Sequence, residues 1–242
     1  MWSGSLARCW KNWYEQNKHN WKIQTYGIHN QSDIHAENIV LNEENSKFDV
    51  CLENETEKIT VPVGGEHFVL NSLCAIAVGK VLHIENKLIK KGIETFILTK
   101  NRMEIIELKE GIKVINDAYN SSVESVRASI EYMQHMKANR RIAVLGDILE
   151  TGKFAKSLHE EIGKIVSKNR INILICSGEN AKYIVESAKM NGFDEKNIYY
   201  FENKEQIIDL LRQILQPEDV VLLKASNGMR FFDMVEELKN IK

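Results

Sequence analysis

The sequence contains little proline and little cysteine. Only two of its 242 residues are proline, and no proline-rich or glycine- and serine-rich run marks a long linker. The four cysteines lie far apart and lack a C-x-x-C spacing: Cys9, Cys51, Cys74 and Cys176. A disulfide framework is therefore not expected, and the reduced thiols of a cytoplasmic protein are the simplest interpretation.

An excess of charge of one sign is also absent. Lys and Arg number 32 and Asp and Glu number 34, which gives a net charge of −2. A polybasic nucleic-acid binder needs clustered basic residues, and a membrane span needs about 20 consecutive apolar residues; neither pattern occurs. Residues 1–21 lack the apolar core of a signal peptide. We expect a cytoplasmic monomer with no nucleic-acid and no membrane partner.

Several common catalytic motifs are missing as well. Each Gly-Lys pair is followed by an apolar residue instead of Ser or Thr, so there is no phosphate-binding P-loop. Neither G-x-G-x-x-G nor G-x-S-x-G occurs. The run His159-Glu160-Glu161 begins like the helix of a zinc peptidase, but no second His stands four residues after His159. The sequence therefore predicts no metal site.

The first third of the chain has the pattern of short strands followed by one helix. Strands are predicted over residues 22–28, 34–41, 48–54 and 58–63, separated by Asn, Asp, Glu and Gly. Apolar residues then recur at helical spacing and predict a largely buried helix over residues 66–82. Residues 1–21 fit neither period, so no element is predicted there.

From about Lys100 onwards, apolar strands alternate with amphipathic helices. The predicted strands are 114–116, 141–145, 171–176, 197–201 and 219–223. The predicted helices are 123–136, 155–168, 180–190, 204–215 and 228–238. This alternation predicts an α/β domain with a doubly wound, mainly parallel sheet. The boundary falls between Lys91 and Arg102, so we expect one domain over residues 1–93 and a second over residues 94–242.

Polar residues follow three of these strands, at the sheet edge where open parallel sheets bind ligands. The loops are residues 116–122, 146–152 and 224–228. Each loop also has a plain structural interpretation. Ser121 with Glu124 fits a capping box, Asp147 after a glycine fits a turn, and Ser226–Gly228 fits a cap of the last helix. Lys224 is harder to explain by packing, because a lysine at the end of a buried strand must pair, reach solvent or meet an anionic ligand.

Six segments, taken in order, resemble one family. Gly65–Asn71 resembles G-x-H-N-x-x-N, Asn101–Glu104 resembles G-R-x-E, and Asp117–Asn120 matches D-A-Y-N. Gly146–Gly152 resembles G-D-M-x-E-L-G, Ser157–His159 resembles S-x-x-H with one residue fewer between Ser and His, and Lys224–Ser226 resembles K-G-S. The chain thus resembles the latter part of a Mur ligase, and within that family the branch that adds D-alanyl-D-alanine.

The resemblance implies a fold and a reaction. Residues 1–93 would be a remnant of the family's central ATPase domain, and residues 94–242 its Rossmann-like C-terminal domain. The family reaction uses ATP and Mg²⁺ to activate the carboxylate of UDP-N-acetylmuramoyl-tripeptide as an acyl phosphate. The amine of D-Ala-D-Ala then attacks it and forms the amide of a peptidoglycan precursor. ATP, D-Ala-D-Ala and the UDP-linked tripeptide are the implied small-molecule partners.

The resemblance also assigns residues, position by position. The implied nucleotide-binding residues are Asn71 beside adenine, Arg102 at the phosphates, Asp117 near the ribose, and Tyr119 and Asn120 in the same loop. The implied substrate-cleft residues are Asp147, Ser157, His159, Lys224 and Ser226. For His159, a histidine that merely packs on a helix face remains an alternative. No residue of this chain is assigned a catalytic or metal-binding role.

The sequence departs from the family pattern at several positions. Phe68 stands where the family usually has Asn, Asn101 and Ala225 each stand for Gly, and the P-loop region is missing. Two hypotheses follow. The chain is a portion of a D-alanyl-D-alanine-adding ligase that is inactive by itself, or it is a stand-alone, non-catalytic module that binds nucleotide or peptide.

Overall fold

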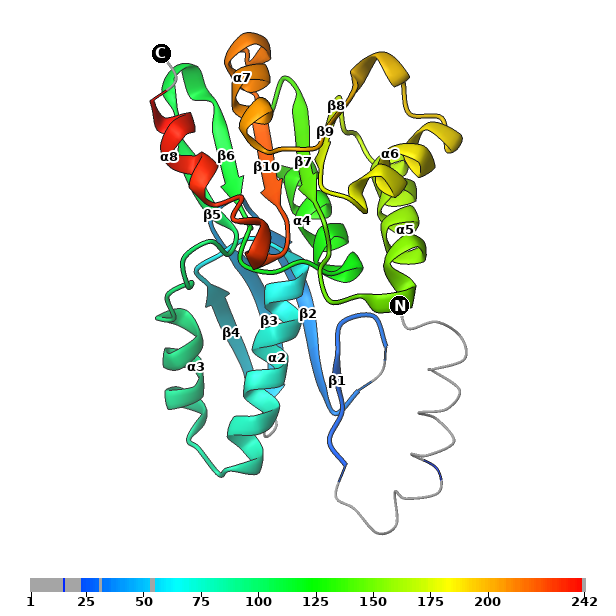
Figure 1. Cartoon of the computed structure of the whole chain (residues 1–242). Coiled ribbons are helices and arrows are strands. Elements are labelled where there is room, and N and C mark those ends of the chain that lie inside the picture. Colours follow the sequence, from blue (N-terminus) through cyan, green and yellow to red (C-terminus); the bar gives the residue numbers. More distant parts are fainter. Residues whose placement is uncertain (1–14, 16–22, 31, 53–54, 241–242) are drawn as a thin grey trace. The chain divides into compact units, whose positions relative to one another are not determined.

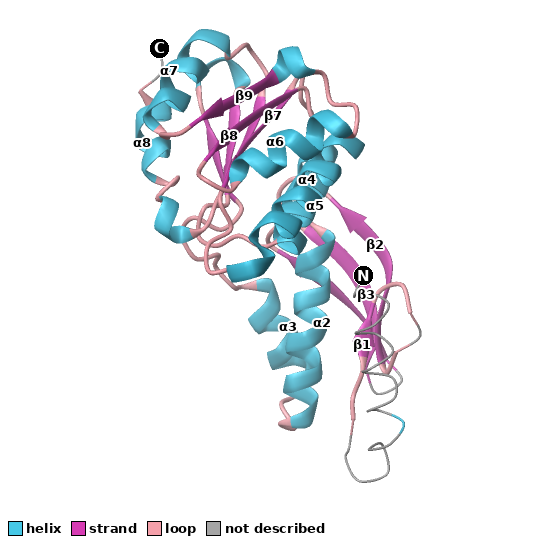
Figure 2. Ribbon diagram, turned by 45° about the vertical axis from the view of Figure 1, so that its right-hand side comes forward, coloured by secondary structure: helices cyan, strands magenta, loops and turns pink. Residues whose placement is uncertain are grey.

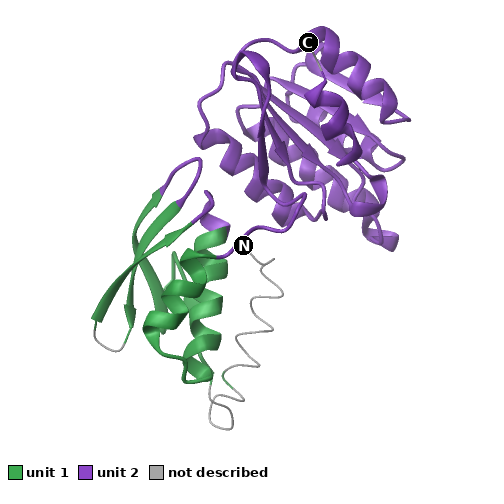
Figure 3. Cartoon of the chain, turned by 90° about the vertical axis from the view of Figure 1, so that its left-hand side faces the viewer, with its two compact units in different colours: residues 1–40, 46–61, 68–95 green, residues 41–45, 62–67, 96–242 purple. Residues whose placement is uncertain are grey.

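The computed structural model describes residues 15, 23–30, 32–52 and 55–240. They fall into two compact units, coloured separately in Figure 3. The first unit comprises residues 1–40, 46–61 and 68–95, and the second comprises residues 41–45, 62–67 and 96–242. Apart from Glu15, the first 21 residues, for which the sequence predicts no element, lie outside the described residues.

The first unit is built on a small mixed sheet with strand order β1-β2-β3-β4. The strands are β1 (Tyr26–Gly27), β2 (Ile34–Leu41), β3 (Ser46–Leu52) and β4 (Glu55–Val61). β1 runs parallel to β2, whereas β3 and β4 form an antiparallel pair. Alternate residues of β3 are buried, as expected of a sheet with one covered face.

Two helices complete this unit: α2 (Glu66–Val81) and α3 (Asn86–Glu94). The predicted helix over residues 66–82 is confirmed by α2, whose buried residues include Val69, Leu73 and Ile76. The sequence does not predict α3, which packs against β4 and buries only Ile89 and Ile93. Within the described part of the chain, no helix is long and apolar enough to cross a membrane.

The second unit contains a six-stranded sheet with strand order β5-β6-β10-β7-β8-β9 (Figure 1). The strands are β5 (Glu104–Glu107), β6 (Lys113–Asn116), β7 (Arg141–Gly146), β8 (Ile173–Ser177), β9 (Ile198–Phe201) and β10 (Val220–Lys224). All neighbouring pairs are parallel except β5 with β6. The predicted doubly wound, mainly parallel α/β fold is confirmed, with β5 as an unpredicted antiparallel edge strand.

Helices cover both faces of this sheet. The helices are α4 (Val123–His135), α5 (Ala155–Lys168), α6 (Ala181–Met190), α7 (Glu205–Ile214) and α8 (Asp233–Lys239). On one face, residues of α7 and α8 join a buried cluster with Val144 of β7 and Val221 of β10. After β9, at one edge of the sheet, the chain returns to form the central strand β10. Since this step across the sheet is opposite to the steps from β6 to β9, right-handed crossovers place α4, α5 and α6 on the other face (Figure 2).

Short 3₁₀ helices lie in the connections: η1 (Lys109–Gly111), η2 (Gly152–Phe154), η3 (Glu195–Asn197) and η4 (Asn227–Met229). The predicted final helix over residues 228–238 is divided into η4 and α8, because Arg230 takes a left-handed conformation with φ of 53°. The predicted capping box is also displaced by one residue. Ser122 caps α4 together with Ser125, not Ser121 with Glu124.

A hairpin tip formed by residues 41–45 belongs to the second unit. The carboxylate of Glu43 pairs with the ammonium of Lys113 and accepts a hydrogen bond from the Lys137 backbone N–H at 3.0 Å. The Tyr132 hydroxyl donates to the Glu43 carbonyl. Burial and the negative charge of Glu43 raise the pKa of Tyr132, so this hydroxyl keeps its proton. A Cβ at Gly64 would lie 2.1 Å from the Asn42 carbonyl oxygen, so only glycine fits there.

Candidate functional site

The candidate site lies at the carboxyl edge of the second unit's sheet, where the loops after β6, β10 and β7 meet. Asp117 directly follows β6 and is buried. One carboxylate oxygen accepts from the Met103 backbone N–H at 3.2 Å, and the other accepts from the Ser129 hydroxyl at 2.7 Å. The ammonium of Lys224 also donates to that second oxygen. Asp117 thus joins the 101–104 segment, α4 and β10.

Lys224 ends β10 with its side chain only 1% exposed. Besides the carboxylate of Asp117, its ammonium donates to the Asn120 carbonyl at 3.2 Å and, at 3.5 Å, to the Asp117 carbonyl. Burial lowers the pKa of Lys224, and the charge of Asp117 opposes that shift. The buried lysine that the sequence requires to pair does so with the D-A-Y-N loop.

His67, in the motif at the start of α2, contributes to the same electrostatic environment. Burial lowers its pKa to about 4, with Asp117 acting in the opposite direction and Lys224 in the same direction. The imidazole is therefore neutral at neutral pH. His67 lies in the motif Gly65–Asn71 but is not among the predicted site residues; its position two residues after Gly65 is the only signal in the sequence.

Arg102 and Tyr119 form the exposed part of the site. The Arg102 guanidinium lies over the Tyr119 ring, 4.2 Å from its centroid, and Tyr119 is 43% exposed. A cation held over an aromatic face is attracted by the ring's electrostatic field. The Tyr119 backbone N–H donates to the Asn101 carbonyl at 3.0 Å, which holds the two segments together. Asn120 is exposed beside Tyr119.

The backbone of the Asn101–Glu104 segment explains one departure from the family pattern. Asn101 has a φ of 62°, in the left-handed region that glycine adopts most easily. Asn tolerates this conformation better than most side chains, so it can replace the family's Gly. The Asn116 side-chain amide donates to Asn101 at 3.0 Å and to Glu104 at 3.1 Å, which fixes the segment.

Asp147, after β7, holds the beginning of α6. Its carboxylate accepts from the backbone N–H groups of Ala181 at 2.7 Å and Asn180 at 3.1 Å. A negative charge is stabilised at a helix N-terminus, because the first N–H groups have no partner within the helix. A Cβ at Gly178 would lie 2.5 Å from a carboxylate oxygen of Asp147, so glycine leaves room for this contact.

His159 is fully buried, and both ring nitrogens have backbone partners. Nδ1 lies 2.7 Å from the Ala155 carbonyl and must donate, so Nε2 accepts from the Ile148 N–H at 3.0 Å. These two bonds connect His159 to its own helix and to the loop after β7. The imidazole has no nitrogen left for a substrate.

The remaining predicted residues differ in exposure. Ser226 is buried, and its hydroxyl accepts from the Leu149 N–H at 2.9 Å. Ser157 is exposed, with its hydroxyl donating to the Phe154 carbonyl at 3.0 Å. Asn71 is exposed on α2 and belongs to the first unit. The structure therefore brings Arg102, Asp117, Tyr119, Asn120 and Lys224 together in the second unit.

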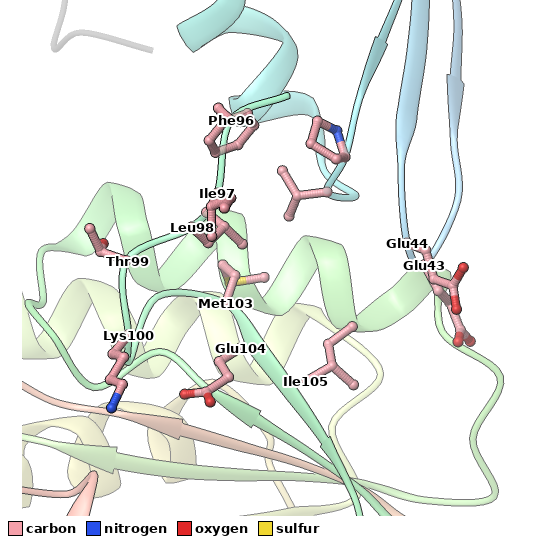
Figure 4. Close-up of a pocket in the computed structure, with 12 residues that line it drawn as sticks. Glu43, Glu44, Phe96, Ile97, Leu98, Thr99, Lys100, Met103, Glu104 and Ile105 are labelled. Atoms are coloured by element: carbon pink, nitrogen blue, oxygen red, sulfur yellow. The ribbon is translucent and has the colours of Figure 1, made fainter. Parts of the chain in front are cut away.

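A separate cavity of about 390 Å³ lies on the second unit, beside the Asn101–Glu104 segment (Figure 4). Its lining includes Glu44, Leu98, Lys100, Met103 and Ile105. None of the predicted nucleotide or substrate-cleft residues lines it. The sequence offers no signal for this cavity, because an extended segment without periodicity forms part of its wall.

The carboxylates at the site do not suit a metal ion. Asp117 is occupied by Lys224, Ser129 and the Met103 N–H, and Asp147 by the start of α6. Among the residues that the structure describes, no three His, Cys, Asp or Glu side chains are grouped so that they could hold a cation. The Mg²⁺ implied by the family therefore does not fit the described residues of this chain.

The fold and the site together define a doubly wound α/β domain with exposed cationic and aromatic groups at the carboxyl edge of its mainly parallel sheet. Residues 101–227 match the family model described as Mur ligase, glutamate ligase domain, and residues 6–79 match the Mur ligase middle domain. The chain belongs to the Mur ligase family.

Curated relatives agree with this assignment. A UDP-N-acetylmuramoyl-tripeptide–D-alanyl-D-alanine ligase of Bacillus subtilis is 29% identical over 225 residues, which cover 92% of this chain and 48% of the relative. The ligase of the same name from Buchnera aphidicola is 29% identical, over 96% of this chain and 49% of the relative. The chain thus spans about half the length of the curated relatives it matches.

Solved structures show the same fold. A MurF structure from Acinetobacter baumannii superposes with a TM-score of 0.81 at 22% identity, covering 93% of this chain and 48% of that one. MurF ligase from Thermotoga maritima in complex with ADP gives a TM-score of 0.76 at 20% identity, over 95% of this chain and 51% of that one.

Proposed function

We propose that this chain is a portion of an ATP-dependent ligase that joins D-alanyl-D-alanine to UDP-N-acetylmuramoyl-tripeptide. The observation that supports this most is the exposed Arg102–Tyr119 pair next to Asp117, in a chain whose curated relatives carry that ligase's name. In the complete reaction, ATP converts the tripeptide carboxylate into an acyl phosphate. The amine of the dipeptide attacks it, forming the amide and releasing ADP and phosphate.

Arg102 would bind the nucleotide phosphates. Its planar guanidinium offers a fork of N–H donors that suits phosphate oxygens, and stacking on Tyr119 orders that fork before a ligand arrives. Asn120 adds an exposed amide in the same loop. Asn71, exposed on α2 of the first unit, is proposed to contact adenine on the basis of the family pattern alone.

Asp117 would receive a ribose hydroxyl. A carboxylate has about four acceptor positions, and three are taken by Met103, Ser129 and Lys224. The remaining position lies on the oxygen that accepts from Met103. A single weak donor such as a hydroxyl suits it, whereas a metal ion would compete with Lys224.

The loop after β7 would face the amino substrate. Asp147 and His159 hold this loop from inside, while Ser157 presents an exposed hydroxyl next to it. We assign direct substrate contact to Ser157 and to the backbone of the loop. Asp147, His159, Lys224 and Ser226 contribute by fixing its position and that of the neighbouring loop.

The complete ligase uses ATP and Mg²⁺ by family resemblance, and its UDP-linked substrate points to the cytoplasm. We propose a monomer that acts on small molecules. Hydrolysis of ATP by this chain alone is not expected, because its sequence has no P-loop, and phosphoryl transfer depends on positioned donors and metal.

Titration of ADP into the full chain by calorimetry tests the proposal. Saturable binding is expected, with Arg102→Ala weakening it by about tenfold or more and Arg102→Lys by less, because Lys keeps the charge but loses the fork. Failure of the wild-type chain to bind ADP would contradict the nucleotide assignment. Amide formation from ATP by this chain alone would contradict the view that it is only a portion, and would also exclude a non-catalytic module.

A further inference from the structure

β10 occupies the centre of the six-stranded sheet, hydrogen-bonded to β6 on one side and to β7 on the other. The residues that follow its last buried apolar position, Leu223, are therefore flanked by two loops of the candidate site. One loop is residues 117–120 after β6, and the other is residues 147–152 after β7. Lys224 and Ser226 each bind one of them.

The side chain of Lys224 binds the loop after β6. Its acceptors are the carboxylate and carbonyl of Asp117 and the carbonyl of Asn120. An ammonium has three protons to donate, and these three acceptors account for all of them. The Lys224 side chain is also only 1% exposed. Contact with a ligand would require Lys224 to abandon the loop and leave Asp117 buried without its counter-charge.

The hydroxyl and the backbone N–H of Ser226 bind the loop after β7. Its hydroxyl accepts from the Leu149 N–H at 2.9 Å, and its own N–H donates to the Asp147 carbonyl at 3.1 Å. Ala225, between the two, packs against Gly146, where an added Cβ would lie 2.7 Å from the Ala225 Cβ. The whole segment thus faces protein on both sides.

We propose that Lys224 and Ser226 are positioning residues that form a two-sided clamp. Lys224 places the loop that carries Tyr119 and Asn120, Ser226 places the loop that precedes Ser157, and neither side chain touches the ligand. The significance of the clamp for ligand binding rests on the proposed function. The clamp itself is a property of the free protein and can be measured without any ligand.

Amide hydrogen exchange of the full chain tests the clamp, with each variant serving as the control for the other. In Ser226→Ala, the Leu149 amide is expected to exchange about tenfold faster or more, while the Tyr119 and Ser121 amides keep their wild-type rates. In Lys224→Met, the Tyr119 and Ser121 amides are expected to accelerate by about tenfold or more, while Leu149 is unchanged. Loss of protection at both loops in either variant would overturn the proposal.

Binding of ADP separates positioning from direct contact. In Lys224→Met, weaker ADP binding should accompany the loss of loop protection. Weaker binding with wild-type exchange at Tyr119 and Ser121 would show that the lysine contacts the ligand, which overturns the proposal. If wild type does not bind ADP, the proposed function fails, but the exchange pattern still decides on the clamp.

A second variant covers the case in which Lys224→Met does not fold. Ser129→Ala removes one hydrogen bond to Asp117 and keeps the ion pair with Lys224. Protection of the 117–121 loop should then fall by less than about tenfold and Leu149 should not change. If the exchange rates of the Leu149 and Tyr119 amides increased equally in Ser129→Ala, the proposal that the two loops are held independently would be contradicted.

Discussion

Arg140 and Asp219 form a two-bonded ion pair at the amino ends of β7 and β10. Arg140 Nε lies 3.0 Å from one carboxylate oxygen of Asp219, and Nη2 lies 2.6 Å from the other. Asp219 is completely buried, and the Gln216 N–H donates to it at 2.8 Å. The paired Asp219 raises the pKa of Arg140. This ion pair connects the amino ends of β7 and β10, at the end of the sheet opposite the candidate site.

Substitutions at this pair are expected to change stability. Asp219→Ala leaves Arg140 without its partner and should lower the free energy of unfolding by about 3 kcal/mol. Arg140→Lys keeps the charge but forms only one of the two bonds, and should cost about 1–2 kcal/mol. Urea unfolding measures both values. Wild-type stability of Arg140→Lys would show that the two-bonded geometry contributes nothing.

The same substitution at two helical glycines should have opposite effects. Gly163 lies where α5 crosses α6, and a Cβ there would be 2.5 Å from the Ile184 carbonyl oxygen. Gly92 in α3 is exposed, and a Cβ there would have no neighbour within 4 Å. Gly163→Ala should destabilise by about 1–3 kcal/mol because backbone must move. Gly92→Ala should stabilise by up to about 1 kcal/mol because alanine favours helices.

Thermal melting of these two variants, compared with wild type, checks whether Gly163→Ala lowers the stability and Gly92→Ala raises it. A stabilising Gly163→Ala would mean that α5 and α6 can separate at little cost. A destabilising Gly92→Ala would show that helix propensity does not govern α3.

Asp147 and Gly178 should be coupled energetically. Asp147→Ala removes the acceptor of two backbone N–H groups at the start of α6, which should cost about 1–2 kcal/mol. Gly178→Ala should cost at least as much, because φ is 124° and the new Cβ would displace the Asp147 carboxylate. In the double variant the displacement no longer matters, so the combined loss should fall short of the sum by about 1 kcal/mol. Additive losses in a double-mutant cycle would contradict this coupling.

His67 should make stability depend on pH in the mildly acidic range. Its folded pKa of about 4 lies below the 6.5 of an unperturbed histidine, so the unfolded chain binds the proton first. The free energy of unfolding is not reduced by this histidine above pH 6.5. It falls as the pH is lowered from 6.5 towards 4, with a slope of at most about 1.4 kcal/mol per pH unit. Subtracting the unfolding free energies of His67→Gln from those of wild type isolates this histidine. A difference that does not vary between pH 6.5 and 4 would exclude the shift.

The elements that could be predicted from the sequence are those with strong periodicity. The predicted bounds of β2 and α5 agree with the structure, since β2 is rich in apolar residues and the apolar residues of α5 recur at helical spacing. β5 and α3 were missed for a physical reason: both are largely exposed, β5 at a sheet edge and α3 with two buried residues. An element that buries so little leaves only a faint pattern in the sequence.

At the candidate site, the sequence predicts local features but not contacts between residues that are distant in sequence. A buried strand end predicts that Lys224 needs a partner, but Asp117 lies 107 residues away in sequence, and nothing local identifies it. Asp147 likewise caps a helix that begins 34 residues later. Even the capping box, which is local, was displaced by one residue because Ser121 and Ser122 are chemically equivalent.

The hairpin tip at Glu43 has a consequence for synthesis on the ribosome. Its contacts to Lys113, Tyr132 and Lys137 span 70, 89 and 94 residues of sequence. At about 5–20 residues per second, residue 137 follows residue 43 by roughly 5–20 s. Until Lys113 is made, the nascent chain carries Glu43 without any of these three partners. Folding of the second unit therefore cannot be completed in the order of translation, since its earliest residues wait for its later ones.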